Sequence, residues 1–202
     1  MWKKGNVMNR RLTLAQYRGI DLFFFSVMLV ISETVITLAA TRWFPDQLYT
    51  VSVTAALTMI VMMRWGPWCA VHALLGGLVF CVASGAGARQ YAVYCVGNLM
   101  GLACLPVLRA IGGERVRKDV LLSLLTALLT QLLMQLGRGV LAVLAMGASS
   151  AQFFAFFTTD ALSDLFSMVI IWIARRLDGM FENQVNYLLR IQKGEDERSG
   201  FS

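Results

Sequence analysis

Charged residues are scarce in this chain of 202 amino acids, of which 15% are Asp, Glu, Lys or Arg and 57% are hydrophobic. A soluble domain typically has about a quarter of its residues charged. The deficit excludes an ordinary water-soluble fold. The hydrophobic residues gather in runs, several of which exceed the ~18–20 residues that a bilayer-spanning helix needs. We therefore predict an all-α integral membrane protein with a single transmembrane domain.

Motifs for catalysis and metal binding are also lacking. The chain has one histidine, His72, and no His-Glu metal motif, no Gly-x-Ser-x-Gly and no phosphate-binding loop. The four cysteines lie inside hydrophobic runs without metal-ligand spacing, which is typical of buried free thiols, although a disulfide between Cys81 and Cys95 is conceivable. These absences predict no enzymatic activity, no metal site, no cofactor and no ATP hydrolysis by a known motif.

Six hydrophobic segments are separated by turn-forming residues. Gly66-Pro67 ends the second segment, and glycine-containing breaks follow the third, fourth and fifth. The first segment is too long for the core of a signal peptide and has no convincing cleavage site after it, so we expect it to be retained. The expected spans are residues 21–41, 49–63, 68–83, 91–111, 120–146 and 152–174.

Lysine and arginine are distributed unevenly around these spans. Fifteen fall in the terminal segments and in the loops after the second and fourth spans, whereas only Arg42 and Arg89 fall on the opposite side. The positive-inside rule then places both termini in the cytoplasm. It also accounts for the net charge of +6 without a nucleic-acid partner. The expected parts are a cytoplasmic basic segment (1–20), a six-helix domain (21–174) and a cytoplasmic tail (175–202).

The tail carries hydrophobic residues near helical spacing between positions 175 and 191. This pattern predicts a short amphipathic helix. Such a helix would either lie on the lipid surface or dock a cytoplasmic partner, and the pattern favours neither.

Four charged residues lie deep inside the hydrophobic segments: Glu33, Arg138, Asp160 and Asp164. A lone arginine at the centre of a lipid-spanning helix costs at least ~2.5–3.5 kcal/mol, so Arg138 must face protein or water and have a partner. At a rise of about 1.5 Å per residue, Glu33, Arg138 and Asp160 each lie roughly 12 Å below the outer end of their span. Asn98 falls near that level, and Gln135 and Asp164 lie about one turn deeper.

Polar residues follow helical stripes on these spans. Gln131, Gln135 and Arg138 share one face of the fifth span, and Asp160 and Asp164 share a face of the sixth. Because unsatisfied polar groups are costly in lipid, the stripes must turn inward and build one polar pocket that is open to the outside. Aromatic residues are expected to roof it: Trp43, Phe44, Tyr49, Tyr91, Tyr94, Phe153, Phe156 and Phe157. The candidate substrate-binding residues are Glu33, Tyr94, Asn98, Gln131, Gln135, Arg138, Phe153, Phe157, Asp160 and Asp164.

This pocket contains three acids and one base. Arg138 and Asp160 could form a buried ion pair that only locks two helices together, but such a pair leaves a surplus of negative charge. We therefore expect either a proton on one acid or a small polar ligand with a cationic or amine group, stacked on aromatic side chains.

Small residues mark two helix contacts. Gly97 and Gly101 form a Gly-x-x-x-Gly pattern, which lets helices approach closely in a membrane. The third span carries a smooth strip of small residues, Ala70, Ala73, Gly76 and Gly77. The strip either packs within the chain or faces outward and docks another membrane protein.

Several short motifs occur in a fixed order. The turn Arg-Trp-Gly-Pro-Trp at 64–68 precedes Gly76-Gly77, and Gly97-Asn98 with Gly101 follows. With six spans in about 200 residues, this order resembles the substrate-binding S component of an energy-coupling factor (ECF) vitamin transporter. Arg-Arg-Leu-Asp at 175–178 is also similar to that family, and the resemblance covers most of the chain.

The resemblance implies a protein of the bacterial cytoplasmic membrane that captures a vitamin or similar micronutrient in its outer half. It also implies a transmembrane coupling protein and two cytoplasmic ATPases as partners, with release of the cargo by toppling in the bilayer. The family often carries an Ala-x-x-x-Ala motif on the inner part of the first span. This chain has Phe-Phe-Phe-Ser-Val-Met at 23–28 instead, so its docking mode departs from the family pattern.

Two other functions fit parts of the sequence. A structural or scaffold subunit of the cell envelope would need the buried charges only as internal pairs. An intramembrane enzyme would use Asp160 and Asp164, whose spacing of four residues places both carboxylates on one helix face. Adjacent acids on one face are common in ligand and ion paths, so the enzyme is the less favoured of the two.

Overall fold

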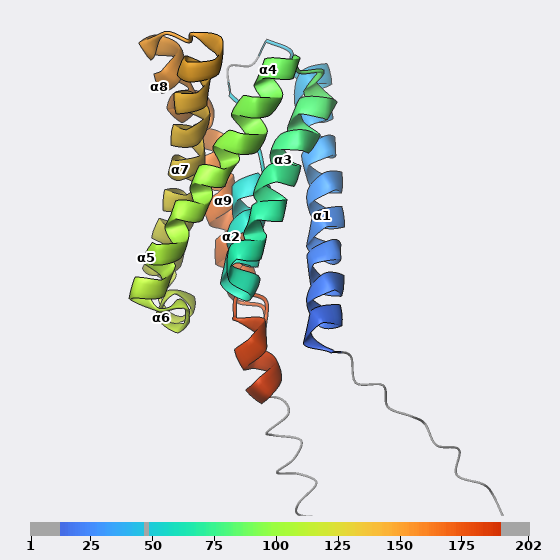
Figure 1. Ribbon diagram of the computed structural model, residues 1–202, viewed down its shortest axis with the longest axis vertical. Helices are drawn as coiled ribbons and strands as arrows, with labels where there is room; N and C mark the ends of the chain where they lie inside the picture. The colour runs from blue at the N-terminus through green and yellow to red at the C-terminus, as the bar shows by residue number, and fades with distance from the viewer. Residues whose placement is uncertain (1–12, 47–48, 191–202) are drawn as a thin grey trace, which may run out of the picture.

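The computed structural model describes residues 13–46 and 49–190, and within these ranges the chain is helical with no β-strand. The α-helices pack into one elongated bundle (Figure 1) and are α1 (Leu14–Trp43), α2 (Thr54–Trp65), α3 (Cys69–Ser84), α4 (Ala88–Tyr91), α5 (Cys104–Ile111), α6 (Gly113–Lys118), α7 (Val120–Met146), α8 (Ser150–Thr159) and α9 (Ala161–Ala174). Five helical segments of this part of the chain are long and apolar enough to cross a membrane: Leu14–Trp43, Thr54–Ser84, Ala88–Ile111, Val120–Met146 and Ser150–Ala174. The architecture supports the expected all-α membrane class.

The first helix begins earlier than the predicted residue 21. Thr13 is the N-cap of α1: the amide of Gln16 donates to the Thr13 hydroxyl at 3.3 Å, and the amide of Thr13 donates to Gln16 Oε1 at 3.0 Å. This reciprocal pair satisfies two amides that would otherwise lack partners. Part of the segment 1–20 is therefore helical, whereas its residues 1–12 lie outside the described chain.

Helices α2 and α3 form a hairpin. The chain reverses at η1 (Gly66–Trp68), where Gly66 has a φ of 61°, which only glycine adopts readily. Gly76 of α3 lies against the side chain of Thr54 at the start of α2, so the two arms run side by side (Figure 1). The predicted turn is confirmed. The predicted helix start at residue 49 is wrong, because residues 49–53 are not helical.

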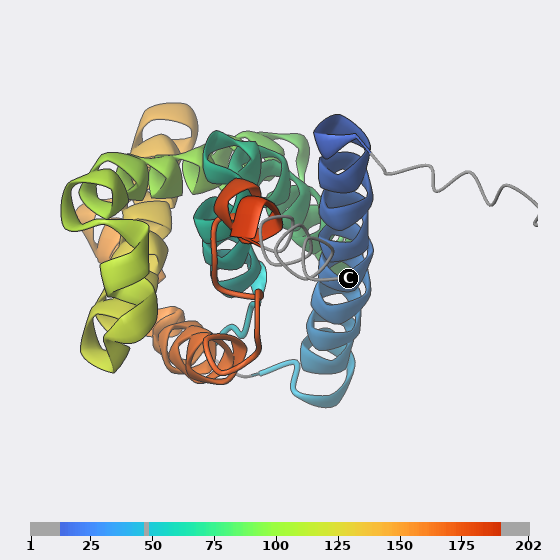
Figure 2. The ribbon, with the colours of Figure 1, turned by 90° about the horizontal axis from the view of Figure 1, so that it is seen from below.

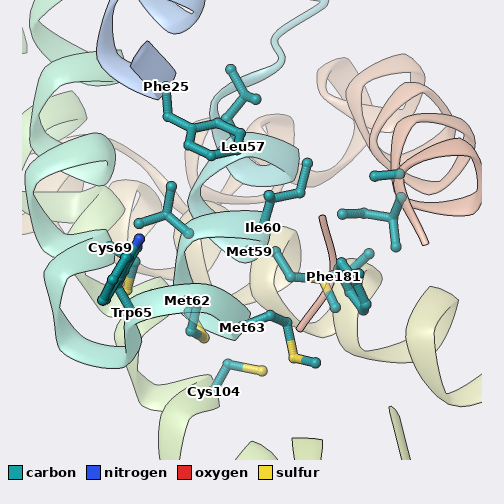
Figure 3. Packing of buried hydrophobic residues seen from close by; sticks show 14 of the residues in the cluster. Phe25, Leu57, Met59, Ile60, Met62, Met63, Trp65, Cys69, Cys104 and Phe181 are labelled. Atoms are coloured by element: carbon teal, nitrogen blue, oxygen red, sulfur yellow. The ribbon is translucent and has the colours of Figure 1, made fainter. Parts of the chain in front are cut away.

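The centre of the bundle is α2, in which every residue is buried. Its side chains pack with Phe25 of α1, Cys104 of α5 and Phe181, which follows α9, in one hydrophobic cluster (Figure 3). A helix that is apolar on all sides must be buried, and here protein surrounds it. Helices α1, α3, α7 and α9 are therefore held around α2.

The segment Ala88–Ile111 is a single helical run with irregular turns. α4 continues into a π-helical turn, η2 (Ala92–Val96), and then into a 3-10 turn, η3 (Leu99–Ala103), before α5 begins. Gly97 lies so close to α7 that a Cβ on it would be 2.8 Å from the backbone nitrogen of Arg138. Glycine permits this approach of two backbones. The approach brings Asn98 beside Arg138.

The last hydrophobic segment, Ser150–Ala174, is long enough to be one membrane span, as predicted over 152–174, but its helix is interrupted at Asp160 between α8 and α9. Asp160 stands between α8 and α9 with φ −88° and ψ 5°. At this break the carbonyl oxygen of Thr159 accepts a hydrogen bond of 2.9 Å from the amide of Thr50. Non-helical chain at membrane depth needs partners of this kind, because lipid offers none.

Positive charge is concentrated at one end of the bundle. The start of α1, the α2–α3 turn, α6 and the end of α9 lie at this end (Figure 1), which we call the basic end. Nine of the twelve lysines and arginines in the described ranges belong to it, whereas Arg42 and Arg89 lie at the opposite end and Arg138 lies between. The segments in which lysine and arginine are frequent in the sequence thus lie together at one end of the folded bundle.

Residues 175–190 fold back onto the basic end (Figure 2). The amphipathic helix predicted over 175–191 is wrong for its first half, which forms turns, and residues 184–190 alone are helical. Phe181 and Gln184 are each 1% exposed, and Tyr17 of α1 donates to Gln184 Oε1 at 3.3 Å. Residues 179–184 are therefore anchored to the bundle, whereas residues 185 and 186 and residues 189 and 190 are exposed. Residues 191–202 lie outside the described chain.

Arg64 joins three elements at the basic end. Its guanidinium donates to both carboxylate oxygens of Asp21, at 2.8 and 2.7 Å, and to the carbonyl oxygens of Gly179 and Met180, at 2.5 and 3.2 Å. The indole nitrogen of Trp65 also donates to Asp21, at 2.5 Å. The Arg64 and Asp21 side chains are 8% and 14% exposed. A buried ion pair is tolerated when the donor nitrogens of the base and the acceptor oxygens of the acid all have hydrogen-bond partners, as they do here.

Removing one partner of this pair should destabilise the protein strongly. In Asp21→Ala the guanidinium of Arg64 stays buried without its counter-charge, and we expect a loss of roughly 3–5 kcal/mol in the free energy of unfolding. Unfolding of the purified protein in detergent micelles measures this loss.

The matched control is Glu114→Gln, which breaks the exposed pair with Lys118 at 2.8 Å. Exposed pairs contribute little because water already solvates both charges, so this variant should unfold like the wild type. Equal effects of the two substitutions would contradict the assigned role of Arg64.

Candidate functional site

A small polar cavity lies within the bundle. Glu33, on its wall, is nearer to the end of α1 at Trp43 than to its start, so the cavity lies in the half of the bundle away from the basic end. Its volume of about 20 Å³ is enough for one water molecule. The lining residues are Glu33, Thr50, Val51, Ser52, Thr54, Gly76, Gly77, Phe80, Tyr94, Asn98, Arg138 and Asp160.

Arg138 is bound on several sides at this cavity. Its Nη1 donates to Asp160 Oδ2 at 2.5 Å and its Nε donates to Asn98 Oδ1 at 2.8 Å. Asn98 in turn donates to the carbonyl oxygen of Ala73 at 3.1 Å. The guanidinium carbon lies 5.6 Å from the ring centre of Tyr94, and the Arg138 and Asp160 side chains are 6% and 7% exposed. The expected partner of the buried arginine is therefore Asp160, with Asn98 holding the second donor.

Residues 49–53 form one wall of the cavity, and we call them the strap. Its backbone finds partners in side chains: the amide of Val53 donates to Glu33 Oε2 at 3.1 Å, and the amide of Ser52 donates to Ser163 Oγ at 3.0 Å. The Thr50 hydroxyl donates to Asp160 Oδ1, and the Ser163 hydroxyl donates to the carbonyl oxygen of Thr50 at 3.0 Å. The strap thus ties α1 to the α8–α9 break.

Glu33 differs from Asp160 in its surroundings. It is 1% exposed, and within residues 13–46 and 49–190 no lysine, arginine or histidine forms an ion pair with it. Asp160 is matched by Arg138, whereas the carboxyl group of Glu33 accepts from the backbone of Val53. An ionised carboxylate buried without a counter-charge is unfavourable. Glu33 is therefore the acid in this layer that is available to a proton or a cationic group.

Half of the predicted substrate-binding residues line the cavity. Glu33, Tyr94, Asn98, Arg138 and Asp160 do so. The other five lie elsewhere, and they are Gln131, Gln135, Phe153, Phe157 and Asp164.

Asp160 and Asp164 keep helical spacing, with the amide of Asp164 donating to the carbonyl oxygen of Asp160 at 3.1 Å, but their side chains have different partners. Asp164 accepts a hydrogen bond of 2.9 Å from Gln135, one turn deeper in the bundle. Gln131 is 1% exposed, and its two amide atoms have no hydrogen-bond partner in the described chain. Phe153 packs on Gly139 and lies 5.8 Å from Phe157. These residues extend the polar layer and the helix packing without reaching the cavity.

The aromatic wall is smaller than the sequence suggests. Tyr94 stacks with Phe80 at 4.5 Å between ring centres and with Phe156 at 6.2 Å. Trp43, Phe44 and Tyr49 are 74%, 60% and 52% exposed, so they do not roof the cavity. Tyr94 and Phe80 are the aromatic side chains in contact with it.

The small-residue strip of α3 packs inside the chain. Ala73 is fully buried, Gly76 lies against Thr54, and Gly77 lies against the backbone of Tyr94. These three residues therefore pack within the chain, whereas Ala70 is partly exposed. The close contacts bring α2 and η2 to the cavity wall.

Sequence reasoning missed the strap. Residues 50–54 read Thr-Val-Ser-Val-Thr, which alternates polar and β-branched apolar residues. Alternation with period two is typical of strand-like, non-helical backbone, and it was the available signal. Inside a long hydrophobic run the alternation is easily taken for the start of a membrane helix.

The other potentially reactive side chains are the four cysteines and His72. All four cysteines are free, so Cys81 and Cys95 form no disulfide. His72 is buried, and its Nε2 lies 3.4 Å from Ser26 Oγ. Among residues 13–46 and 49–190, no three His, Cys, Asp or Glu side chains gather closely enough to hold a metal ion.

Comparison of the chain with protein-family models, curated proteins and solved structures finds no match.

Adding a methyl group at Gly97 should disturb the cavity. A Cβ there meets the backbone of Arg138 at 2.8 to 2.9 Å, so Gly97→Ala must push α7 away and strain the bond from Arg138 to Asn98. We expect a loss of about 1–3 kcal/mol in unfolding free energy, measured in detergent.

Gly19→Ala is the matched control, because a Cβ on Gly19 of α1 has no atom within 4 Å. Alanine is a better helix former than glycine, so this variant should be unchanged or more stable by up to about 1 kcal/mol. A destabilised Gly19→Ala, or an unaffected Gly97→Ala, is the result that contradicts the close crossing.

Proposed function

We propose that this protein is the membrane substrate-capture subunit of an ECF-type importer. It binds a small water-soluble vitamin or related micronutrient at the cavity and passes it inward. The observation that supports the proposal is the buried cavity, in which Glu33 forms no ion pair within the described residues and the strap forms a wall of non-helical chain. A protein that only spans the membrane has no need of either feature.

The proposed topology has six transmembrane passes with both termini in the cytoplasm of a bacterium. The α2–α3 hairpin supports counting the segment Thr54–Ser84 as two passes. α2 has 12 residues, which span roughly 18 Å as a helix. The five strap residues add up to ~16 Å, so the strap and α2 together match a hydrocarbon core of about 30 Å. The concentration of lysine and arginine at the basic end supports a cytoplasmic location for that end.

The proposed ligand carries a cationic or amine group. Glu33 offers a buried carboxyl group that forms no ion pair among residues 13–46 and 49–190, and Tyr94 and Phe80 offer aromatic faces at the same cavity. Carboxylates and aromatic rings both attract cations, and desolvation strengthens the attraction. The Arg138–Asp160 pair adds donors and acceptors that are already held in place.

Capture of such a ligand requires movement of the strap. The cavity has room for about one water molecule, whereas small-molecule pockets typically measure ~300–1,000 Å³. The strap is joined to the bundle mainly through side-chain hydrogen bonds, so it can separate without breaking a helix. The chain has no phosphate-binding loop, and the energy for transport comes from the proposed partners, a transmembrane coupling protein and two cytoplasmic ATPases.

A scaffold subunit of the cell envelope is the second candidate. The Arg138–Asp160 pair favours it, because a buried pair can serve only to join α7 to the α8–α9 break. Catalysis by Asp160 and Asp164 has less support, since Asp160 faces Arg138 and Thr50 while Asp164 faces Gln135. Each carboxylate is already engaged by other side chains.

Glu33→Gln separates binding from folding. The amide keeps an oxygen that can accept from Val53, so the variant should fold, but it removes the negative charge that attracts the ligand. Native mass spectrometry of the gently extracted wild-type protein should show a retained small molecule. We expect the occupancy to fall at least tenfold in Glu33→Gln, which corresponds to about 1.4 kcal/mol.

The paired substitution Arg138→Met with Asp160→Met tests the second candidate. Both charges are removed together, so stability should be nearly kept, whereas Arg138→Met alone should lose roughly 3–5 kcal/mol. A scaffold tolerates the double variant with no change in its protein partners. Wild-type protein without any retained small molecule, but with a persistent protein partner, overturns the capture function.

A further inference from the structure

A large groove opens at the basic end. It lies among the start of α1, the α2–α3 turn, α5, α6 and residues 181–190, and its volume is about 780 Å³. Five arginines and two glutamates line it. It is separate from the cavity at Glu33, with which it shares no lining residue.

The arginines of the groove are only partly neutralised. Arg64 is matched by Asp21, and a single acid, Glu182, serves both Arg117 at 3.4 Å and Arg190 at 3.1 Å. Arg109 and Arg18 form no ion pair within the described chain. The groove therefore has a surplus of positive charge and attracts anions.

Two arginines at the groove, Arg117 and Arg18, can donate hydrogen bonds to an anion. The Nε atom of Arg117 is shielded from solvent and has no hydrogen-bond partner in the described chain. An unsatisfied buried donor is costly, so an acceptor that reaches it is favoured. The guanidinium carbon of Arg18 lies over the ring of Trp68, 4.4 Å from the ring centre, and both residues line the groove. Arginine binds phosphate oxygens with paired hydrogen bonds.

The groove is also amphipathic. Beneath the arginines its lining includes Met62, Met63, Leu105, Leu108 and Phe181. Trp68 at the rim is 45% exposed, and tryptophan prefers the boundary between lipid tails and water. A free phosphate would use the arginines alone, whereas a phospholipid places its headgroup on the arginines and its glycerol and upper acyl carbons on the apolar side chains.

We infer that this groove is a binding site for the headgroup of an anionic phospholipid. Basic pockets between transmembrane helices on the cytoplasmic side are suited to such headgroups. A lipid here joins α1, the α2–α3 turn, α5 and residues 181–190. Arg64 joins α1 and residues 179–180 to the same turn from within. The site requires a membrane protein and does not depend on the capture function proposed above.

Lipid titration followed by native mass spectrometry tests the site. The full-length protein in detergent is titrated with dioleoylphosphatidylglycerol, which is anionic, or dioleoylphosphatidylcholine, which is zwitterionic. We expect the anionic lipid to bind at least tenfold more tightly. In Arg18→Gln with Arg109→Gln, two surface arginines without ion pairs, binding of the anionic lipid should weaken about tenfold.

The matched control is Arg42→Gln with Arg89→Gln, which removes the same charge from the opposite end. Its affinity for the anionic lipid should be that of the wild type. Equal binding of the two lipids to wild-type protein, or equal loss in the two double variants, overturns the site. Full displacement of the lipid by millimolar inorganic phosphate assigns the groove to free phosphate, and a lipid-independent dimer assigns it to a second copy; either result also overturns the inference.

Discussion

The ion pair between Arg138 and Asp160 is the constraint on which the rest of the structure depends. An arginine at this depth is tolerated in a membrane only if its charge and its donors are satisfied inside the protein. Asp160 reaches Arg138 from the break between α8 and α9, and Asn98 reaches it from a segment that approaches α7 through Gly97. The helix break at Asp160 and the close contact at Gly97 each bring a hydrogen-bond partner to the guanidinium of Arg138.

The strap follows from the same arrangement. Where α8 stops, the carbonyl oxygen of Thr159 and the side chains of Asp160 and Ser163 are free to bind another segment, and residues 49–53 use them. A helix in this place would satisfy its own backbone and would fill the space with side chains. Non-helical chain instead depends on its neighbours and leaves a cavity beside Glu33. The helix break, the strap and the cavity thus lie at one place in the bundle.

The basic end uses arginine differently. Arg64 is saturated by Asp21 and by two backbone carbonyls, so it fixes the α2–α3 turn and residues 179–180 to α1. Other arginines around it keep unneutralised charge and face a groove of about 780 Å³. Two layers of charge therefore bracket the apolar core around α2. One layer lines a small cavity, and the other meets the surface where charged groups of a membrane or the cytoplasm lie.

The sequence by itself determined the class of protein, the end that is basic, and the level at which Glu33, Arg138 and Asp160 lie, because hydrophobic length, charge and helical rise are local properties. It did not determine where helices break. α8 and α9 read as one apolar segment, and residues 49–53 read as the start of another, since lipid and protein interior select the same apolar side chains. Only the tertiary structure decided that the strap packs against the break at Asp160, and that Asp164 turns to Gln135 instead of the cavity. Those outcomes depend on hydrogen bonds between residues more than 100 positions apart in one case and between facing helices in the other, and no local pattern encodes them.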